Sequence, residues 1–320
     1  MPTSPRTTPH AAPYHEPRRE NCPWCGGDRL RTRARATAPG WRDPGTCVVD
    51  QCRDCKHAFQ NPRLTVAGLA FHHRDFYPGH LEDFAERILS ARALRRRHRA
   101  AAGAVPALPE PESWLDVGTG HARFPETAKE MFPYTSFDGL DATPSVEQAR
   151  QAGRIEEAHI GDLTNPWILP RLHARYDVVS MFRHLEHTPD PRAELRAALT
   201  VLRPGGHLLL ELADPRSAFA WLLGRRWLPY GRPRHLHLLP LANVCAELES
   251  QGCTILTTDR RTPHIPYDLS AALSLSLRNA VLRTAAAPLA GLASVLEHTL
   301  APVLRRTGFS NAYRIVARRD

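Results

Sequence analysis

Residues 113–124 read SWLDVGTGHARF, an apolar run that leads into a glycine-rich turn. Gly118 and Gly120 permit a tight turn and a close approach of the backbone to a ligand. A dinucleotide fingerprint, G-x-G-x-x-G, would need glycine at position 123, where this chain has arginine. Asp116 would repel a pyrophosphate but attract a ligand that carries an ammonium and a sulfonium group. The turn therefore favours S-adenosylmethionine, although such turns also serve simply to connect a strand to a helix.

Short apolar runs alternate with helical patterns along the chain from this point. Strands are expected at 113–117, 134–141, 156–160, 176–182 and 207–213, and helices over 122–132, 144–153 and 190–206. This order predicts an α/β fold with a mostly parallel sheet and helices on both faces. In such sheets, ligands bind beyond the carboxyl ends of the strands.

Acidic residues follow the second and third expected strands as well as the first. Asp141 comes about twenty residues after the glycine turn, where a carboxylate takes the ribose hydroxyls of a nucleoside. Asp162 follows the third strand, where it could accept the adenine amino group. Each could instead cap a helix or loop, although Thr143 and Pro144 fit the start of the next helix better than Asp141 does. Three acids at three successive strand ends are hard to explain as three independent caps.

Five segments now carry a family resemblance. LDVGTGHARF, FDGLDATP, HIGDL, YDVVSMFRHLEHTPDP and LRPGGHLLLE resemble, in this order, the motifs of class I S-adenosylmethionine-dependent methyltransferases. The resemblance covers 113–215 closely, and YRIVARRD at 313–320 resembles the antiparallel last strand of that family. It implies a seven-stranded, doubly wound, Rossmann-like core. It also implies these cofactor contacts: Asp116, Gly118 and Gly120 at the methionine part, Asp141 and Ala142 at the ribose, Asp162 and Leu163 at the adenine, and Phe182 and Arg183 at the sulfonium end.

The first part of the chain carries a second motif. Two C-x-x-C knuckles, Cys22/Cys25 and Cys52/Cys55, can close a tetrahedral cage of four thiolates around zinc. Such a cage has no open coordination position, so the expected role is structural. Four buried or redox-active thiols are the alternative. A fifth cysteine, Cys47, is expected to be a strand residue, with His57 as a less favoured replacement ligand.

The chain therefore divides into four expected parts. Residues 1–20 are interpreted as a disordered, proline-rich tail, 21–62 as a zinc-binding module, and 63–105 as a helical linker that covers the cofactor. Residues 106–320 form the methyltransferase domain, with an apolar helical insertion at about 268–305. Helices packed on the core are the simplest interpretation of that insertion; a lid, a dimer face or a membrane-surface helix stay open. Sugar C-methyltransferases of antibiotic pathways resemble this arrangement of a zinc module and a core.

Two histidine clusters are candidates for the base that removes the acceptor proton. His187 follows the fourth strand with Glu186 beside it as an orienting acid, although this turn also serves a structural role in the family. The second candidate is His235. A similar segment of the sugar C-methyltransferases reads Glu-His-Leu, whereas this chain has Arg234 before the histidine. The change argues against chemistry that forms a carbanion and for an anionic or carbonyl-bearing substrate.

Composition bears on the partner. The net charge is +9, but arginine supplies all but two of the basic residues and is spread along the chain, so a solvated surface is favoured over a nucleic-acid groove. The expected acceptor is a small molecule methylated at carbon or oxygen, with RNA methylation as the alternative. No apolar segment is long enough to span a bilayer and the start lacks a signal peptide, which predicts a cytoplasmic protein. Oligomeric state stays open, a homodimer included.

Overall fold

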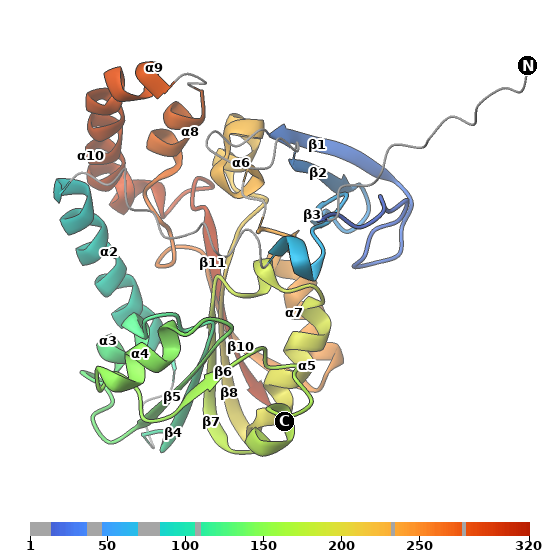
Figure 1. Cartoon of the computed structure of the whole chain (residues 1–320), viewed down its shortest axis with the longest axis vertical. Helices are drawn as coiled ribbons and strands as arrows, with labels where there is room; N and C mark the ends of the chain where they lie inside the picture. The colour runs from blue at the N-terminus through green and yellow to red at the C-terminus, as the bar shows by residue number, and fades with distance from the viewer. Residues whose placement is uncertain (1–13, 37–46, 70–83, 106–109, 232–233, 277–279) are drawn as a thin grey trace, which may run out of the picture.

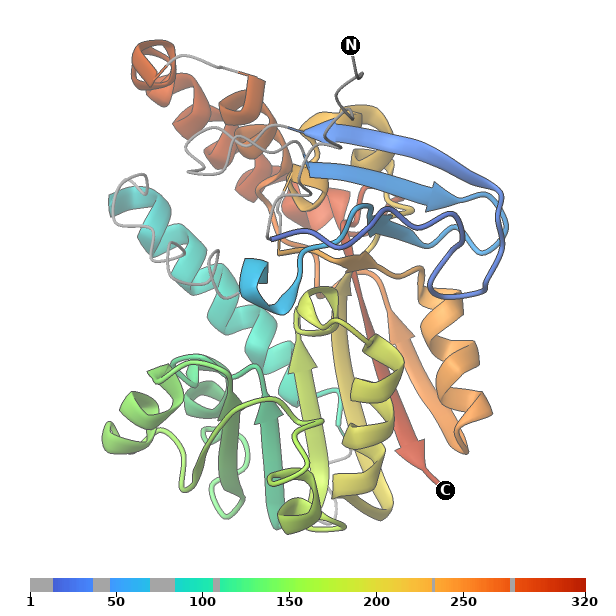
Figure 2. The same cartoon turned by 45° about the vertical axis from the view of Figure 1, so that its right-hand side comes forward.

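The computed structural model describes residues 14–36, 47–69, 84–105, 110–231, 234–276 and 280–320. A large twisted sheet occupies the centre, and a smaller sheet lies beyond the carboxyl ends of its parallel strands (Figures 1 and 2). Helices α2, α3 and α4 lie on one side of the large sheet, and α5 and α7 on the other (Figure 1). This layered arrangement leaves the carboxyl ends of the strands facing the small sheet.

The large sheet has seven strands in the order β10-β11-β8-β7-β4-β5-β6. Four strand pairs are parallel, and β11 is antiparallel to both of its neighbours. This topology confirms the predicted Rossmann-like core, antiparallel last strand included. The strands are β4 (Ser113–Val117), β5 (Ser136–Asp141), β6 (Ala158–Ile160), β7 (Tyr176–Phe182), β8 (Leu202–Ala213), β10 (Cys253–Asp259) and β11 (Ala312–Arg319).

Alternating side chains along the strands fill two cores. Leu115 packs with residues of α5 and α7, such as Leu195 and Leu248, whereas its neighbour Trp114 packs on the other face with Ala101 of α2. Period-two alternation in a sheet covered on both sides has this result. The helices are α2 (Phe84–Ala102), α3 (Arg123–Ala128), α4 (Ser145–Gln151), α5 (Pro191–Val201) and α7 (Leu241–Ser250), with short 3-10 turns at Leu169–Leu172, Leu185–His187, Gly224–Arg226 and Leu228–Gly231.

The largest difference from the predicted boundaries lies between α5 and β8. The helix expected over 190–206 ends at Val201, and β8 begins at Leu202, which pairs with Tyr176 of β7. Pro204 cannot continue a helix, and Gly205 adopts a φ of 77°, so the chain turns into the strand earlier than the periodicity suggests. The start of the helix is as expected, because the Asp190 carboxylate accepts hydrogen bonds from two backbone N–H groups of its first turn.

The small sheet joins the amino-terminal module to the core. Its strands are β1 (Leu30–Ala36), β2 (Cys47–Cys52), β3 (Ala58–Gln60) and β9 (His237–Leu238), in that order. Since β9 comes from the methyltransferase part, the module shares a sheet with the core. Cys47 is the buried first residue of β2, as predicted.

The expected disordered tail is only partly described. Residues 1–13 lie outside the described residues, but residues 14–20 pack on the module: His15 bridges to Leu64, and Arg18 pairs with buried Asp50 at 2.6 Å. The tail prediction is therefore wrong for residues 14–20, because their backbone and charges find partners on the module.

The expected insertion is helical, with α8 (Asp268–Ser276), α9 (Ala280–Ala285) and α10 (Ala287–Leu304). Pro288 starts α10 rather than breaking it, and Pro302 lies in its last turns. Helix α10 is long and apolar enough to cross a membrane by length and composition, and it is the one helix of the described residues that meets this test. Several of its leucines, Leu289 and Leu292 among them, are exposed. α6 (Ala218–Leu223) lies between the insertion and the small sheet (Figure 1).

Candidate active site

The glycine turn after β4 is shaped by close packing. Gly118 has a φ of 74°, and a Cβ atom there would lie 2.7 Å from Nδ1 of His184. Gly120 also has a positive φ, and its N–H donates to Oδ2 of Asp141 at 2.9 Å. Ala122 completes the turn in the left-handed conformation with its side chain fully buried. Gly118 thus has no room for a side chain, and Gly120 has room but a backbone conformation that favours glycine, so the turn stays tight between the ends of β4 and β5.

The three predicted acids converge at the carboxyl ends of three neighbouring strands. Asp116 is buried, and its Oδ1 accepts a hydrogen bond from Ser180 of β7 at 2.6 Å. Burial raises the pKa of Asp116 to about 7, and the carboxylate of Asp141 adds to the rise. Partial burial and nearby carboxylates, Asp141 included, likewise raise the pKa of Asp162. Raised pKa values at Asp116 and Asp162 suit a cationic ligand, which would favour the ionised form of both carboxyl groups.

Asp141 is fixed by its own loop. Its Oδ1 accepts hydrogen bonds from the backbone N–H of Thr143 at 2.8 Å and from the Thr143 hydroxyl at 2.6 Å. Helix α4 begins after Pro144, and no side chain caps it. Ala142 is exposed beside the carboxylate, and Leu163, after β6, is fully buried. The strand ends thus bring together the residues predicted for ribose and adenine.

Aromatic side chains form a wall at the end of β7. The ring of Phe182 lies 4.4 Å from that of Phe124, centroid to centroid, and His98 of α2 packs against both. Burial, with Arg97 beside it, lowers the pKa of His98 to about 3, so the ring is neutral. His98 is missing from the sequence prediction, since a single histidine in an arginine-rich helix gives no signal of its place in the fold.

The predicted bases His187 and His235 lie together. Their ring centroids are 4.9 Å apart, with His235 buried. Nδ1 of His187 is 2.8 Å from the carbonyl of Arg234, and Nδ1 of His235 is 3.0 Å from the carbonyl of Pro229. In each pair the ring nitrogen must donate, which leaves Nε2 as the atom that can accept a proton in the neutral ring.

Glu186 was expected to orient His187, but its carboxylate contacts other residues. Its buried Oε1 accepts a hydrogen bond from the N–H of Ala213 at 2.8 Å and lies 3.4 Å from Nε of Arg183. The carboxylate therefore ties the turn after β7 to the end of β8. Leu236 N donates to the Glu186 carbonyl at 2.7 Å, which holds the segment around His235 against the same turn.

The four predicted zinc ligands form one cluster. Sγ atoms of Cys22, Cys25, Cys52 and Cys55 all lie within 4.8 Å of one another. Backbone N–H groups of Trp24 and Asp54 donate to Cys22 and Cys52, each at 3.4 Å. Four thiols, two of which accept backbone N–H groups, are the donor set of a structural zinc site, so these residues fit the metal.

The cysteine cluster is linked to the core through two histidines. Nδ1 of His57 lies 3.6 Å from Sγ of Cys22, and its Nε2 lies 3.2 Å from Nδ1 of His237 in β9. Nε2 of His237 in turn lies 3.3 Å from the carbonyl of Pro189. His57 thus lies beside the thiol cluster as an outer contact. These contacts couple the structure of the cysteine cluster to the position of β9, which follows His235.

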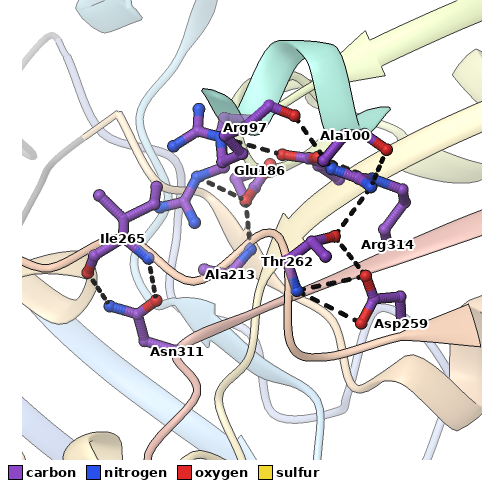
Figure 3. A network of polar contacts seen from close by, with 11 residues as sticks. Arg97, Ala100, Glu186, Ala213, Asp259, Thr262, Ile265, Asn311 and Arg314 are labelled. Atoms are coloured by element: carbon purple, nitrogen blue, oxygen red, sulfur yellow. Dashed lines mark hydrogen bonds and ion pairs between the residues drawn. The ribbon is translucent and has the colours of Figure 1, made fainter. Parts of the chain in front are cut away.

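A buried ionic network lies under α2 at the same end of the sheet. Arg314 of β11 pairs with Glu211 of β8 and donates to the Ala100 carbonyl at 2.7 Å, and Nε of Arg97 lies 3.3 Å from Glu211 (Figure 3). Arg183 donates its backbone N–H to the Glu211 carbonyl at 2.8 Å and has a φ of 56°. Apart from Arg183, this network is missing from the sequence prediction. One signal of this network was present in the sequence, because Glu211 and Arg314 are charged residues within apolar stretches of their strands.

The strand order and the converging acids after β4, β5 and β6 define a class I S-adenosylmethionine-dependent methyltransferase fold. A family model described as "Methyltransferase domain" matches residues 84–258, more than half of the chain. The chain belongs to that family.

Curated relatives match parts of this core. The ubiquinone biosynthesis O-methyltransferase of Aeromonas salmonicida is 32% identical over 87 residues, 25% of this chain and 37% of that protein. The enzyme of the same name from Idiomarina loihiensis is 28% identical over 134 residues, 38% and 53% of the two chains. The chain thus spans about half or less of the length of these relatives. Among solved structures, the cyclase SpnF matches with 20% identity and a TM-score of 0.48, over 70% of this chain and 80% of that one.

Proposed function

We propose that the protein transfers a methyl group from S-adenosylmethionine to a small-molecule acceptor, at oxygen or carbon. The observation that carries this proposal is the convergence of Asp116, Asp141 and the Gly118–Gly120 turn at the ends of β4 and β5. The turn brings a backbone without bulky side chains and two carboxylates close together, which suits a ligand with a cationic amino acid part and a ribose. The family match supports the same cofactor.

S-adenosylmethionine supplies, when bound, a methyl group on a positively charged sulfur, which an acceptor can attack in line. Asp116 would hold the cationic methionine part, Asp141 and Ala142 the ribose, and Asp162 and Leu163 the adenine. Phe182 would exclude water near the sulfonium. Because the leaving group is good, alignment of the acceptor supplies much of the rate enhancement, on the order of several kcal/mol.

His235 is the base that we propose for the acceptor proton. Its Nδ1 faces the Pro229 carbonyl at 3.0 Å, so Nε2 of the neutral ring can accept a proton. His187, 4.9 Å away ring to ring, is the second candidate, and Glu186 positions the turn that carries it.

We further propose that residues 21–62 bind a structural zinc ion through Cys22, Cys25, Cys52 and Cys55, and that residues 106–320 are the methyltransferase domain, with 63–105 as a linker. All four thiolates would be used by the metal, so zinc has no open position for chemistry. Its role is to fix the position of β3. Because β3 pairs with β9, the metal would also fix the strand that follows His235.

A label-fate assay tests the proposed function. The protein is incubated with methyl-labelled S-adenosylmethionine and either total RNA or a small-molecule extract of the source cell. We expect label in a low-mass product, and much less label with the Asp141→Ala variant at a limiting concentration of S-adenosylmethionine. Label in RNA would overturn the acceptor class and favour RNA methylation, and no label in either pool together with no binding of S-adenosylhomocysteine would overturn the cofactor.

A further inference from the structure

We propose that Arg97 and Arg183 form a binding site for a carboxylate group of the methyl acceptor. This inference rests on the proposed function for the identity of the ligand as an acceptor, but the site itself follows from charge and exposure. It lies at the carboxyl ends of β7 and β8, where α2 crosses the sheet.

The carboxylates of this cluster are shared unevenly. Arg97 and Arg314 share the carboxylate of Glu211, and Arg183 lies beside Glu186. Of two further carboxyl groups, Asp259 interacts with Arg314, and Asp268, whose pKa burial raises to about 7, interacts with Arg183. A guanidinium group held away from water is costly unless it is paired, so the side of the cluster that carries Arg97 and Arg183 favours an anionic ligand.

Exposure separates the sealed part of the cluster from the open part. The side chains of Arg314, Glu211 and Glu186 are 1–2% exposed, whereas those of Arg97 and Arg183 are 13% and 19% exposed. The sealed groups sum to one negative charge and the two open groups to two positive charges. A ligand that approaches from outside therefore meets the two arginines.

Two donor atoms in the open part make no hydrogen bond within the described part of the chain, Nε of Arg97 and Nη1 of Arg183, and both atoms are buried. Nε of Arg97 has only the ion-pair contact with Glu211 at 3.3 Å, and the Arg183 side chain also interacts with Tyr267. Buried donors are normally hydrogen-bonded, so these two atoms favour a ligand that completes their contacts. Oε2 of Glu186 also has no hydrogen-bond partner there, but its side chain is sealed and repels an anion, which directs a carboxylate to the guanidinium side.

The chemistry of the ligand follows from that of the donors. A carboxylate offers two oxygens in one plane, which match the planar N–H groups of guanidinium. Phe182, which precedes Arg183, packs with Phe124 and His98, so an aromatic or apolar body beside the carboxylate would meet rings rather than charges. The inferred acceptor class is an organic acid with an apolar or aromatic body.

Benzoate is the probe for this site, and neutral benzamide of nearly the same shape is its control. The affinity of each is measured by calorimetry on the full chain loaded with S-adenosylhomocysteine. We expect benzoate to bind the wild-type protein at least fivefold more tightly than benzamide does. The preference should be lost in both Arg183→Gln and Arg97→Gln, retained in large part in Arg183→Lys, and unchanged in Arg196→Gln, which alters an exposed arginine on α5.

Three results would overturn the site. Benzoate could bind no better than benzamide, or could bind the Arg183→Gln and Arg97→Gln variants as well as the wild type. The third is a parallel loss of S-adenosylhomocysteine affinity in both variants, which would assign the guanidinium groups to the carboxylate of the cofactor. Benzoate is neither cofactor nor methyl acceptor. The same measurement is therefore repeated on the chain without S-adenosylhomocysteine, and it can be made even if the label-fate assay fails, which keeps the two failures distinguishable.

Discussion

The N–H of Gly120 donates to the carboxylate of Asp141 across the ends of β4 and β5, at 2.9 Å. The other oxygen of the same carboxylate is held by Thr143. One side chain thus fixes the glycine turn and presents its remaining lone pairs toward the space beyond the sheet. The relationship gives Asp141 two roles, in the shape of the turn and, by our proposal, in holding the ribose.

Replacing Asp141 with alanine should therefore weaken cofactor binding. Hydrogen bonds to a charged group contribute about 1.5–3 kcal/mol each, so we expect the affinity for S-adenosylhomocysteine to fall by roughly 10- to 100-fold. Calorimetry measures the change. Glu147→Gln, in the first turn of α4 where the side chain pairs with Arg150, is the matched control and should bind as the wild type does. Equal affinity in Asp141→Ala and wild type would contradict the assignment.

Asp116 should make cofactor binding depend on pH. Its pKa is raised to about 7 by burial, so below that pH the carboxyl group is protonated and attracts a cation poorly. We expect the affinity for S-adenosylmethionine to rise as the pH increases through 7, with a proton released on binding. Asp116→Asn should bind weakly with little pH dependence over that range. Calorimetry in buffers of different ionisation enthalpy measures the released proton, and its absence near pH 7 would argue against contact between Asp116 and the cofactor.

The same pKa has a consequence for stability without ligand. The folded protein holds the Asp116 proton more tightly than the unfolded chain, whose carboxyl pKa is near 3.8. The contribution of this group to the free energy of unfolding is therefore complete below pH 4 and is lost as the pH rises through about 7. Bound cofactor should offset that loss, so its stabilising effect in thermal unfolding should be larger at pH 8 than at pH 6.

Local sequence was sufficient to bring together the residues that we propose for the cofactor. Asp116, Gly118 and Gly120 lie within five residues, and Asp141 and Asp162 each follow a strand, so the parallel order of the strands brings them together. The predicted helix end at residue 206 was wrong, and the helix ends at Val201. The period of a helix does not show where a following strand begins to pair. Pairing of Leu202 with Tyr176 decides that boundary.

The proposed acceptor half depends on contacts that the sequence pattern does not encode. Arg97, Glu211 and Arg314 come from a helix and two strands more than a hundred residues apart, and the charges of Glu211 and Arg314 within apolar strands do not show which residues they meet. Likewise β9 is two residues long and pairs with β3 about 180 residues earlier, as Phe59↔His237 shows. Contacts of this kind form only when distant segments pack together, and they leave no periodic pattern in the sequence. The sequence therefore predicted His235 as a candidate base, but not that β3 of the module pairs with the strand that follows it.

Loss of one zinc ligand should affect both the module and the core. In Cys55→Ser we expect the metal content to fall from about one zinc per chain to well below one, since structural zinc needs its full set of thiolates. The transition temperature should fall, and methyl transfer with it, because β3 holds β9. Elemental analysis and thermal unfolding measure the two effects. Cys245→Ser, on α7 outside the four-cysteine cluster, should retain both; metal absent from freshly purified wild-type protein would contradict the zinc assignment.

His235 should affect turnover without affecting cofactor binding. A general base typically contributes about 10²–10⁴-fold to the rate, so His235→Ala should lose at least 10²-fold in methyl transfer once the acceptor is known. The affinity for S-adenosylhomocysteine should stay within twofold of wild type, because His235 contacts the Pro229 carbonyl and the His187 ring rather than the glycine turn. His187→Ala is the comparison variant: a larger loss there would transfer the role of base to His187. Full turnover in both single variants and in the double variant would show that the acceptor needs no histidine base.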